Sequence, residues 1–324
     1  MNLGAGPYGD SLVAAGVVVA TLLAAGGAGT AAWTLYCRGH HAAAARLAPR
    51  VLALRLLSYA ALGVGLLCAV AAGTAGVAVV CGVCSVIAAD EWARLFDLPR
   101  HHRLSLLVTA PLTVVAAALL GEGAAIVMMP GMIALGLVWP VIAANTERGM
   151  RDLGVAALGY VYVGIGLAHA VVLVRDIPAG ASVLVAVAVA TAMSDVAAFI
   201  VGRRFGRGRL APRLSPNKTR AGVVGNLVGA LVGVALFAPA FGAAVASVIA
   251  ADSPAFVIVL LVMAVAIGLG AVWGDLFESA AKREATVKDA GTWLPGFGGL
   301  LDRIDSLLVT VPMTYWFLRL VLAT

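Results

Sequence analysis

Charge is scarce in this chain. Asp, Glu, Lys and Arg make up only 12% of its 324 residues, and aromatic residues a further 6%. Soluble domains average about 25% charged residues. Hydrophobic residues account for 62%, and the mean hydropathy is +1.02. A water-soluble fold of this length has too little interior to bury so much apolar surface, so lipid is the expected solvent for most of the chain.

Cysteine is also rare, with four residues in all. Cys81 and Cys84 form a CxxC, a spacing found in redox and metal sites. They lie inside the apolar run 77–89, with no His and no second CxxC beside them. We therefore interpret them as small apolar packing residues, and nothing in the sequence requires a disulfide.

Apolar runs of the length that crosses a bilayer, about 20 residues, recur along the chain. We predict about ten spans, at 11–36, 51–71, 73–89, 104–120, 123–145, 153–174, 180–201, 222–250, 255–281 and 305–323. They predict an all-α fold, a polytopic transmembrane helical bundle. No Lys or Arg precedes the first run, which is long enough to span, so we interpret it as a span and not as a cleaved signal.

The polar breaks between these runs alternate in charge. Of the 22 Lys and Arg, all but Arg175 and Arg319 lie in the odd-numbered breaks. Lys and Arg concentrate in the cytoplasmic loops of membrane proteins. The bias predicts that the odd-numbered breaks are cytoplasmic and that the N-terminus and the C-terminus both lie outside. It accounts for the net charge of +6 without a nucleic-acid partner, because no basic module with interleaved aromatic residues is present.

The break between runs 180–201 and 222–250 carries seven cationic residues. One interpretation is topology retention together with attraction to anionic lipid headgroups. The stretch Ser215-Pro-Asn217-Lys218-Thr219 differs, because hydroxyl, amide and ammonium groups are donors that bind phosphate. The glycines of this loop match neither GxGxxG nor a Walker loop.

Acidic residues mark a second segment. Asp275, Glu278 and Lys282 are spaced to share one helix face, and an ionisable residue within a span is a functional candidate. Asp302 and Asp305 begin the last run. The simpler alternatives are an interfacial ion pair for the first set and helix capping for the second. Two carboxylate pairs around a basic, Gly-rich loop favour Mg²⁺ holding a polyphosphate.

Two sets of glycines recur at every fourth residue: Gly225, Gly229 and Gly233, and Gly270 and Gly274. Small residues at this spacing let transmembrane helices approach closely. We interpret them as packing faces that could bring runs 222–250 and 255–281 together and set Asp275 against the loop after Lys218.

The two segments together resemble the CDP-diacylglycerol synthase (phosphatidate cytidylyltransferase) family. The family signature S-x-x-K-R-x-x-x-x-K-D-x-G-x-x-x-P-G-H-G-G-x-x-D-R-x-D keeps its spacing at Ser279, Lys282, Arg283, Lys288, Asp289, Gly291, Pro295, Gly296, Gly298, Gly299, Asp302, Arg303 and Asp305. An upstream family stretch is matched at Ser194, Asp195, Ala198, Ser215, Pro216, Asn217, Lys218, Thr219 and Gly222. The likeness divides the chain into divergent N-terminal transmembrane helices, 1–150, and a cytidylyltransferase-like transmembrane catalytic region, 151–324.

Three positions depart from the family pattern. Phe297 replaces the His of P-G-H-G-G, Ala221 replaces the Glu of K-T-x-E-G, and Val196 replaces the Thr after Ser-Asp. The chain has no His beyond His169, so any proton transfer or phosphate contact made by the motif His is missing. A tolerated loss, a different substrate and a weakened paralogue all stay open.

The resemblance implies a membrane-embedded nucleotidyltransferase of phospholipid biosynthesis, which makes CDP-diacylglycerol and pyrophosphate from CTP and phosphatidate. The alternatives are a cytidylyltransferase for another lipid phosphate and a weakened, non-enzymatic paralogue. The resemblance also implies Mg²⁺, and it leaves open a second, monovalent cation such as K⁺ and a homodimer. It indicates a multi-pass protein of the inner (plasma) membrane with its active site on the cytoplasmic face.

By the same resemblance, the catalytic residues are Asp302, Asp275, Lys282 and Asp305, with Asp275 and Asp302 as metal ligands. The substrate-binding residues are Ser215, Asn217, Lys218, Thr219, Arg283, Lys288, Asp289 and Arg303. Phosphoryl-type transfers depend mostly on positioning and charge neutralisation. The lipid phosphate is largely a dianion at neutral pH, because its second pKa is about 6, and this lowers the need for a general base.

Overall fold

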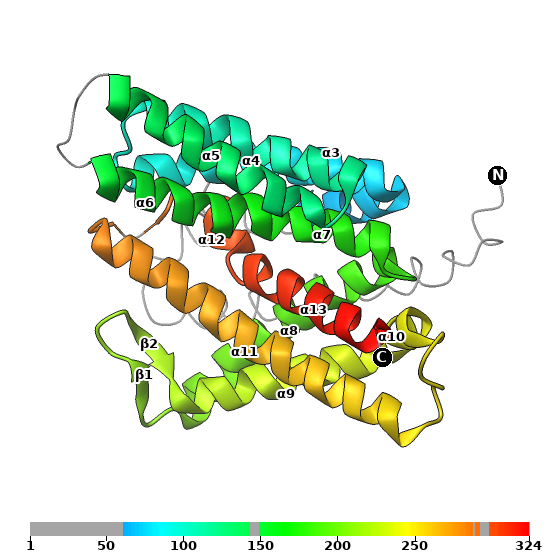
Figure 1. Cartoon of the computed structure of the whole chain (residues 1–324). Helices are drawn as coiled ribbons and strands as arrows, with labels where there is room; N and C mark the ends of the chain where they lie inside the picture. Colours follow the sequence, from blue (N-terminus) through cyan, green and yellow to red (C-terminus); the bar gives the residue numbers. More distant parts are fainter. Residues whose placement is uncertain (1–60, 143–148, 288, 292–297, 324) are drawn as a thin grey trace.

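The computed structural model describes residues 61–142, 149–287, 289–291 and 298–323, and most of them are helical (Figure 1). The helices before the hairpin are Ala61–Ala71, α3 (Gly73–Leu95), α4 (Arg100–Leu120), α5 (Gly123–Ile142), α6 (Gly149–Gly159), the π-helical turn η1 (Tyr160–Ile165), α7 (Gly166–Asp176) and α8 (Gly180–Phe205). After the hairpin follow α9 (Arg220–Leu236), α10 (Ala238–Val245), α11 (Pro254–Glu284), α12 (Leu301–Ile304) and α13 (Leu307–Leu322). The predicted helical fold is therefore confirmed for the described residues.

One element was not predicted. Strands β1 (Arg209–Ala211) and β2 (Ser215–Thr219) form an antiparallel hairpin in the break between runs 180–201 and 222–250. The pairing sets Arg209 opposite Thr219 and Ala211 opposite Ser215. The prediction of a purely α-helical fold is corrected by this hairpin, which gives the phosphate-donor stretch a paired backbone.

The described residues contain five helices that are long and apolar enough to cross a membrane, or six if α9 and α10 form one broken span. Shorter apolar helices lie at Ala61–Ala71, Val127–Val138 and Leu307–Leu322. Run 11–36 and the first part of run 51–71 lie outside the described residues. The count of ten spans, the sides of the termini and the division near residue 150 stay predictions.

The predicted run 222–250 is not one straight helix. It breaks at Phe237, where α9 and α10 meet at a bend of 67°. Pro239 lies in the first turn of α10 and has no N–H to donate to the preceding turn, which favours a break at this point.

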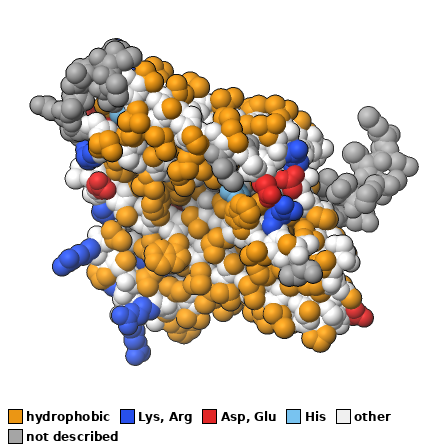
Figure 2. Space-filling view, viewed as in Figure 1, with side chains coloured by type: hydrophobic (Ala, Val, Ile, Leu, Met, Phe, Trp, Pro, Cys, Tyr) orange, Lys and Arg blue, Asp and Glu red, His pale blue; other side chains and the backbone are white. Residues whose placement is uncertain are grey.

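The apolar surface matches the expectation from composition. Leu119, Phe199 and Trp273 are each more than 60% exposed although they lie in long apolar helices. Figure 2 shows apolar side chains over most of the visible face, with Lys and Arg projecting at the end where the hairpin lies. A face of this kind is suited to contact with lipid.

The glycine faces allow close packing as predicted, but neither of them packs α9 against α11, the pairing that the sequence predicted. A Cβ added to Gly229 or Gly233 would lie 2.5 Å from backbone atoms of α8. A Cβ added to Gly274 would lie 2.6 Å from the carbonyl oxygen of Asp305. The first set therefore joins α9 to α8 and not to α11, while Gly274 lets α11 meet the chain that leads into α13.

Candidate active site

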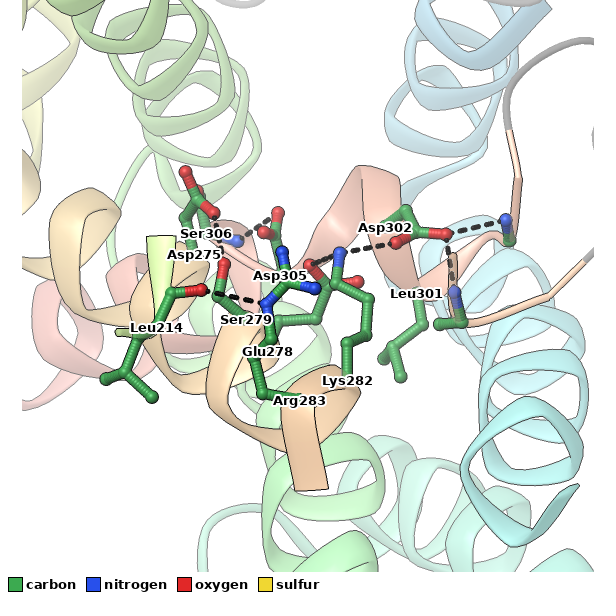
Figure 3. A network of polar contacts seen from close by, with 12 residues as sticks. Leu214, Asp275, Glu278, Ser279, Lys282, Arg283, Leu301, Asp302, Asp305 and Ser306 are labelled. Atoms are coloured by element: carbon green, nitrogen blue, oxygen red, sulfur yellow. Dashed lines mark hydrogen bonds and ion pairs between the residues drawn. The ribbon is translucent and has the colours of Figure 1, made fainter. Parts of the chain in front are cut away.

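Three carboxylates converge at the end of the bundle where the hairpin lies. Asp275 and Glu278 project from α11, and Asp305 lies between α12 and α13. One oxygen from each lies within 4.8 Å of the other two (Figure 3). Gly274 permits this, because any side chain there would collide with the backbone of Asp305. The predicted common face of Asp275 and Glu278 is thus confirmed.

This cluster suits a divalent cation. Glu278 is only 2% exposed, and its Oε1 has no hydrogen-bond partner among the described residues. A buried carboxylate oxygen without a partner is costly, and neighbouring carboxylates repel one another. A hard cation such as Mg²⁺, which prefers oxygen ligands, relieves both costs. Asp275, Glu278 and Asp305 are therefore the residues that could hold a metal ion.

Two lysines contact the edges of this cluster. Lys218 Nζ lies 2.6 Å from Asp275 Oδ2. Lys218 directly precedes Thr219, the N-cap residue of α9. Lys282 Nζ lies between Glu278 and Asp302, and its distance to Asp302 Oδ1 is 2.8 Å (Figure 3). The cationic groups therefore lie beside the acidic cluster, as the sequence predicted for a site that binds phosphates.

Asp302, predicted to bind the metal ion together with Asp275, makes different contacts from those of the carboxylate cluster. Its Oδ1 accepts a hydrogen bond from Lys282, and its Oδ2 accepts from the N–H groups of Ala290, at 3.0 Å, and Gly299, at 2.8 Å. Burial raises the pKa of Asp302, but contacts with Glu278, Lys282 and Gly299 outweigh it and hold the pKa below its usual range. Asp302 is not among the three converging carboxylates of the described residues.

The predicted phosphate-binding stretch lies beside α11. Arg283 Nε donates to the carbonyl oxygen of Leu214 at 3.2 Å, which ties the end of α11 to the hairpin. Ser215 is half-buried and Asn217 is exposed. The Thr219 hydroxyl accepts from the N–H of Gly222 and caps α9, so it already has a structural role.

The remaining predicted residues are spread around the site. Asp289 is exposed and lies against Gly298, since a Cβ at Gly298 would approach the Asp289 side chain to 3.2 Å. Arg303 is half-buried on α12. Lys288 and Phe297 lie outside the described residues. The substrate-binding roles of all these residues stay predictions.

Glu91 was not among the predicted site residues, although Glu91-Trp-Ala-Arg-Leu95 loosely resembles the family. This α3 residue is 2% exposed, and its two oxygens accept hydrogen bonds from the N–H groups of Leu300 and Leu301. The site residue and its partners are more than 200 positions apart, so no local spacing pattern connects them. The signals in the sequence were that loose resemblance and an acidic residue at the end of an apolar run.

Comparison with known proteins identifies relatives of this chain. The family model described as "Cytidylyltransferase family" matches residues 53–321. The chain is 36% identical over 234 residues to the phosphatidate cytidylyltransferase of Pseudomonas aeruginosa, which covers 70% of this chain and 82% of the relative. It is 32% identical over 181 residues to the phosphatidate cytidylyltransferase of Thermotoga maritima, covering 56% of this chain and 64% of the relative.

A further relative has no stated activity. The chain is 32% identical over 185 residues to the uncharacterized protein YnbB of Escherichia coli K12, covering 55% of this chain and 58% of the relative. The matched part thus spans less than two thirds of both the E. coli and the T. maritima proteins.

Proposed function

Because the chain belongs to the cytidylyltransferase family, we propose that it transfers CMP from CTP to phosphatidate, forming CDP-diacylglycerol and pyrophosphate. The observation that carries this proposal is the convergence of Asp275, Glu278 and Asp305 beside Lys218 and Lys282. Carboxylates for a divalent ion and ammonium groups for phosphates are the two components that such a transfer needs.

The reaction follows from these charges. A lipid phosphate oxygen attacks the α-phosphorus of CTP in line, and the bond from that phosphorus to the pyrophosphate oxygen breaks. Mg²⁺, when bound by Asp275, Glu278 and Asp305, supplies neutralisation of the triphosphate charge. Lys218 exchanges its contact with Asp275 for the phosphates of CTP. Since the attacking phosphate is largely a dianion at neutral pH, no side chain needs to remove a proton.

The orientation in the membrane is part of the proposal. We place about ten spans in the bilayer, both termini outside, and the carboxylate cluster at the cytoplasmic face of the inner membrane. The two basic residues predicted outside support this. Arg319 Nη2 lies 2.9 Å from Glu122 Oε1, and Arg175 Nη1 donates to Ala117 O, so both contact residues near the α4–α5 turn, which the charge bias also predicts to be outside. The diacyl tails of the substrate then stay in lipid while its phosphate meets CTP from the cytoplasm.

A second candidate is transfer of CMP to a different lipid phosphate. The observation that favours it is Phe297, which replaces the His of the family motif. A phenyl ring offers no hydrogen-bond donor or acceptor for a headgroup, so the preference among lipid phosphates can differ from that of relatives with the His.

The test is an assay of the purified protein with radiolabelled CTP, Mg²⁺ and a panel of lipid phosphates that includes phosphatidate. We expect label in CDP-diacylglycerol, none without Mg²⁺, and less than 1% of that rate, roughly, for Asp275→Asn. Label in another lipid product alone supports the second candidate. Absence of a labelled lipid with every substrate, with and without K⁺, would refute the enzymatic proposal and leave a non-enzymatic paralogue. A native-mass measurement on the same sample tests the homodimer.

A further inference from the structure

We propose that Glu91 is a positioning residue, which holds the segment carrying Asp302 and Asp305 in its working place. The kinetic part of this inference rests on the proposed function, whereas the structural part stands without it. Glu91 lies near the C-terminal end of α3, in the half of the chain that the sequence predicted to be divergent, although the family match of residues 53–321 includes it.

The carboxylate makes two backbone contacts. Leu300 N donates to Glu91 Oε1 at 2.9 Å, and Leu301 N donates to Glu91 Oε2 at 2.8 Å. These two N–H groups open α12, which has four residues and no earlier turn to satisfy them. A carboxylate suits this position, because its two oxygens accept hydrogen bonds from both free donors.

Two glycines form the space in which this carboxylate lies. A Cβ at Gly299 would lie 2.7–2.8 Å from three Glu91 side-chain atoms, and a Cβ at Gly291 would come closer still to the same group. In both cases Glu91 supplies all three nearest atoms. The backbone at Gly291 and at Gly299 therefore encloses the Glu91 carboxylate from two sides. No larger residue fits at either glycine unless the carboxylate moves.

Trp92, the residue after Glu91, holds helix α3 in place. Trp92 is fully buried, and its Nε1 donates to the carbonyl oxygen of Val155 at 3.0 Å. Its ring stacks on Phe277 with centroids 6.0 Å apart and an interplanar angle of 6°. Phe277 precedes Glu278 on α11, so the side chain next to Glu91 is braced against the helix that carries two of the three converging carboxylates.

These contacts form a continuous series along the segment. The N–H of Gly299 donates to Asp302, and the next two N–H groups donate to Glu91. Three consecutive amides are thus held by two carboxylates, one from inside the segment and one from α3. Loss of Glu91 frees the end of the segment that leads directly to Asp302 and Asp305, which lowers the precision of the site without removing any of its groups.

The first test needs no knowledge of the reaction. Glu91→Gln keeps the shape of the side chain but replaces one acceptor oxygen with an NH₂ donor, so one of the two amides loses its partner. We expect hydrogen–deuterium exchange of the peptide containing Leu300 and Leu301, in the full-length protein in detergent, to become at least roughly tenfold faster. Asp90→Asn, on the same helix, is the matched control. Unchanged exchange in Glu91→Gln would overturn the inference.

The second test uses the glycine contact. Gly299→Ala and Glu91→Ala should each lower kcat by roughly tenfold or more, with KM for CTP within about twofold. Because Glu91→Ala removes the group that the new methyl meets, the double variant should be no worse than Glu91→Ala alone. Multiplied losses in the double variant, or a rise in KM for CTP with kcat unchanged, would contradict the inference.

Gly82→Ala serves as the glycine control, because a Cβ there meets no atom of the described residues within 4 Å. It should keep the kcat of the unmodified protein. If the unmodified protein turns over none of the lipid phosphates, the proposed function fails, and the exchange experiment alone decides the role of Glu91. The two failures are therefore distinguishable.

Discussion

The Lys218 ammonium lies 2.6 Å from an oxygen of Asp275, although Lys218 comes from the end of the hairpin and Asp275 from within α11. Lys218 is 20% exposed and Asp275 is 42% exposed, so the pair is open to solvent on the side of Asp275. A partly exposed ion pair is weak, and its two members are easily separated. This contact therefore suits a site in which the carboxylate binds a metal ion while the lysine binds a phosphate.

The first prediction concerns Lys218. Removing the charge with Lys218→Met should raise KM for CTP by about 10- to 100-fold, because a hydrogen bond to a charged group contributes about 1.5–3 kcal/mol. Initial rates measured against CTP concentration test this. The control is Arg207→Met, which removes an exposed charge from the same basic loop and should leave KM within about twofold. An equal rise in both variants would indicate a general electrostatic effect.

The second prediction concerns metal binding by Asp305. Asp305→Asn removes one of the three converging carboxylates and should raise the Mg²⁺ concentration needed for half-maximal rate by about tenfold or more. Mn²⁺ binding followed by electron paramagnetic resonance gives a measurement that does not depend on turnover. If the variant bound Mn²⁺ as tightly as the unmodified protein, Asp305 would not be a ligand.

The third prediction separates Asp302 from this cluster. Asp302 contacts Lys282 and two backbone N–H groups, so Asp302→Asn should abolish most turnover by disordering the segment and releasing Lys282. Mn²⁺ affinity should change by less than about threefold, because Asp302 is not one of the converging carboxylates. A large loss of Mn²⁺ affinity would restore the role as a metal ligand that the family resemblance implies.

Much of this site could be predicted from the sequence because its parts are local. Asp275, Glu278 and Lys282 share a face through simple helix spacing, and the structure confirms the Glu278–Lys282 contact. The spacing could not show that Asp305 and not Asp302 completes the cluster, since this depends on how the chain turns between α12 and α13.

The sequence also did not indicate the contacts of Glu91, which lies in the N-terminal half of the chain. Glu91 contacts Leu300 and Leu301 through their backbone N–H groups, and a backbone donor leaves no trace in residue identity. The break in run 222–250 was signalled by Pro239, but overall hydropathy does not distinguish a continuous helix from a bent pair. The hairpin was hidden for a related reason, because three- and five-residue strands are too short to show alternation.

The fourth prediction uses Gly274. A methyl group there would lie 2.6 Å from the carbonyl oxygen of Asp305 and 2.8 Å from Ser306 Cα, and neither backbone atom can move freely. Gly274→Ala should therefore separate α11 from the start of α13 and cost about 1–3 kcal/mol of stability. We expect a fall in Tm and a loss of Mn²⁺ affinity together. The prediction would be wrong if the Tm and the Mn²⁺ affinity of Gly274→Ala matched those of Gly82→Ala.

The last prediction concerns the opposite end of the bundle. Glu122 accepts hydrogen bonds from Arg319 and from the Tyr315 hydroxyl, the latter at 2.6 Å. Hydrogen bonding by Arg319 and then Tyr315 holds the pKa of Glu122 below its usual range. A carboxylate with a lowered pKa stabilises the folded state above its unfolded pKa of about 4.3, and this stabilisation disappears as the pH falls through the lower, folded pKa.

Glu122→Gln should therefore lower Tm by about 2 °C at neutral pH, and the difference from the unmodified protein should narrow below about pH 4. Salt should reduce the difference too, because Glu122 and Arg319 are both about 40% exposed. Turnover at neutral pH should be unchanged, since this contact is remote from the carboxylate cluster. A loss of kcat in Glu122→Gln at full thermal stability would mean that the two ends of the bundle are coupled, and the site would then extend beyond the residues that contact phosphate.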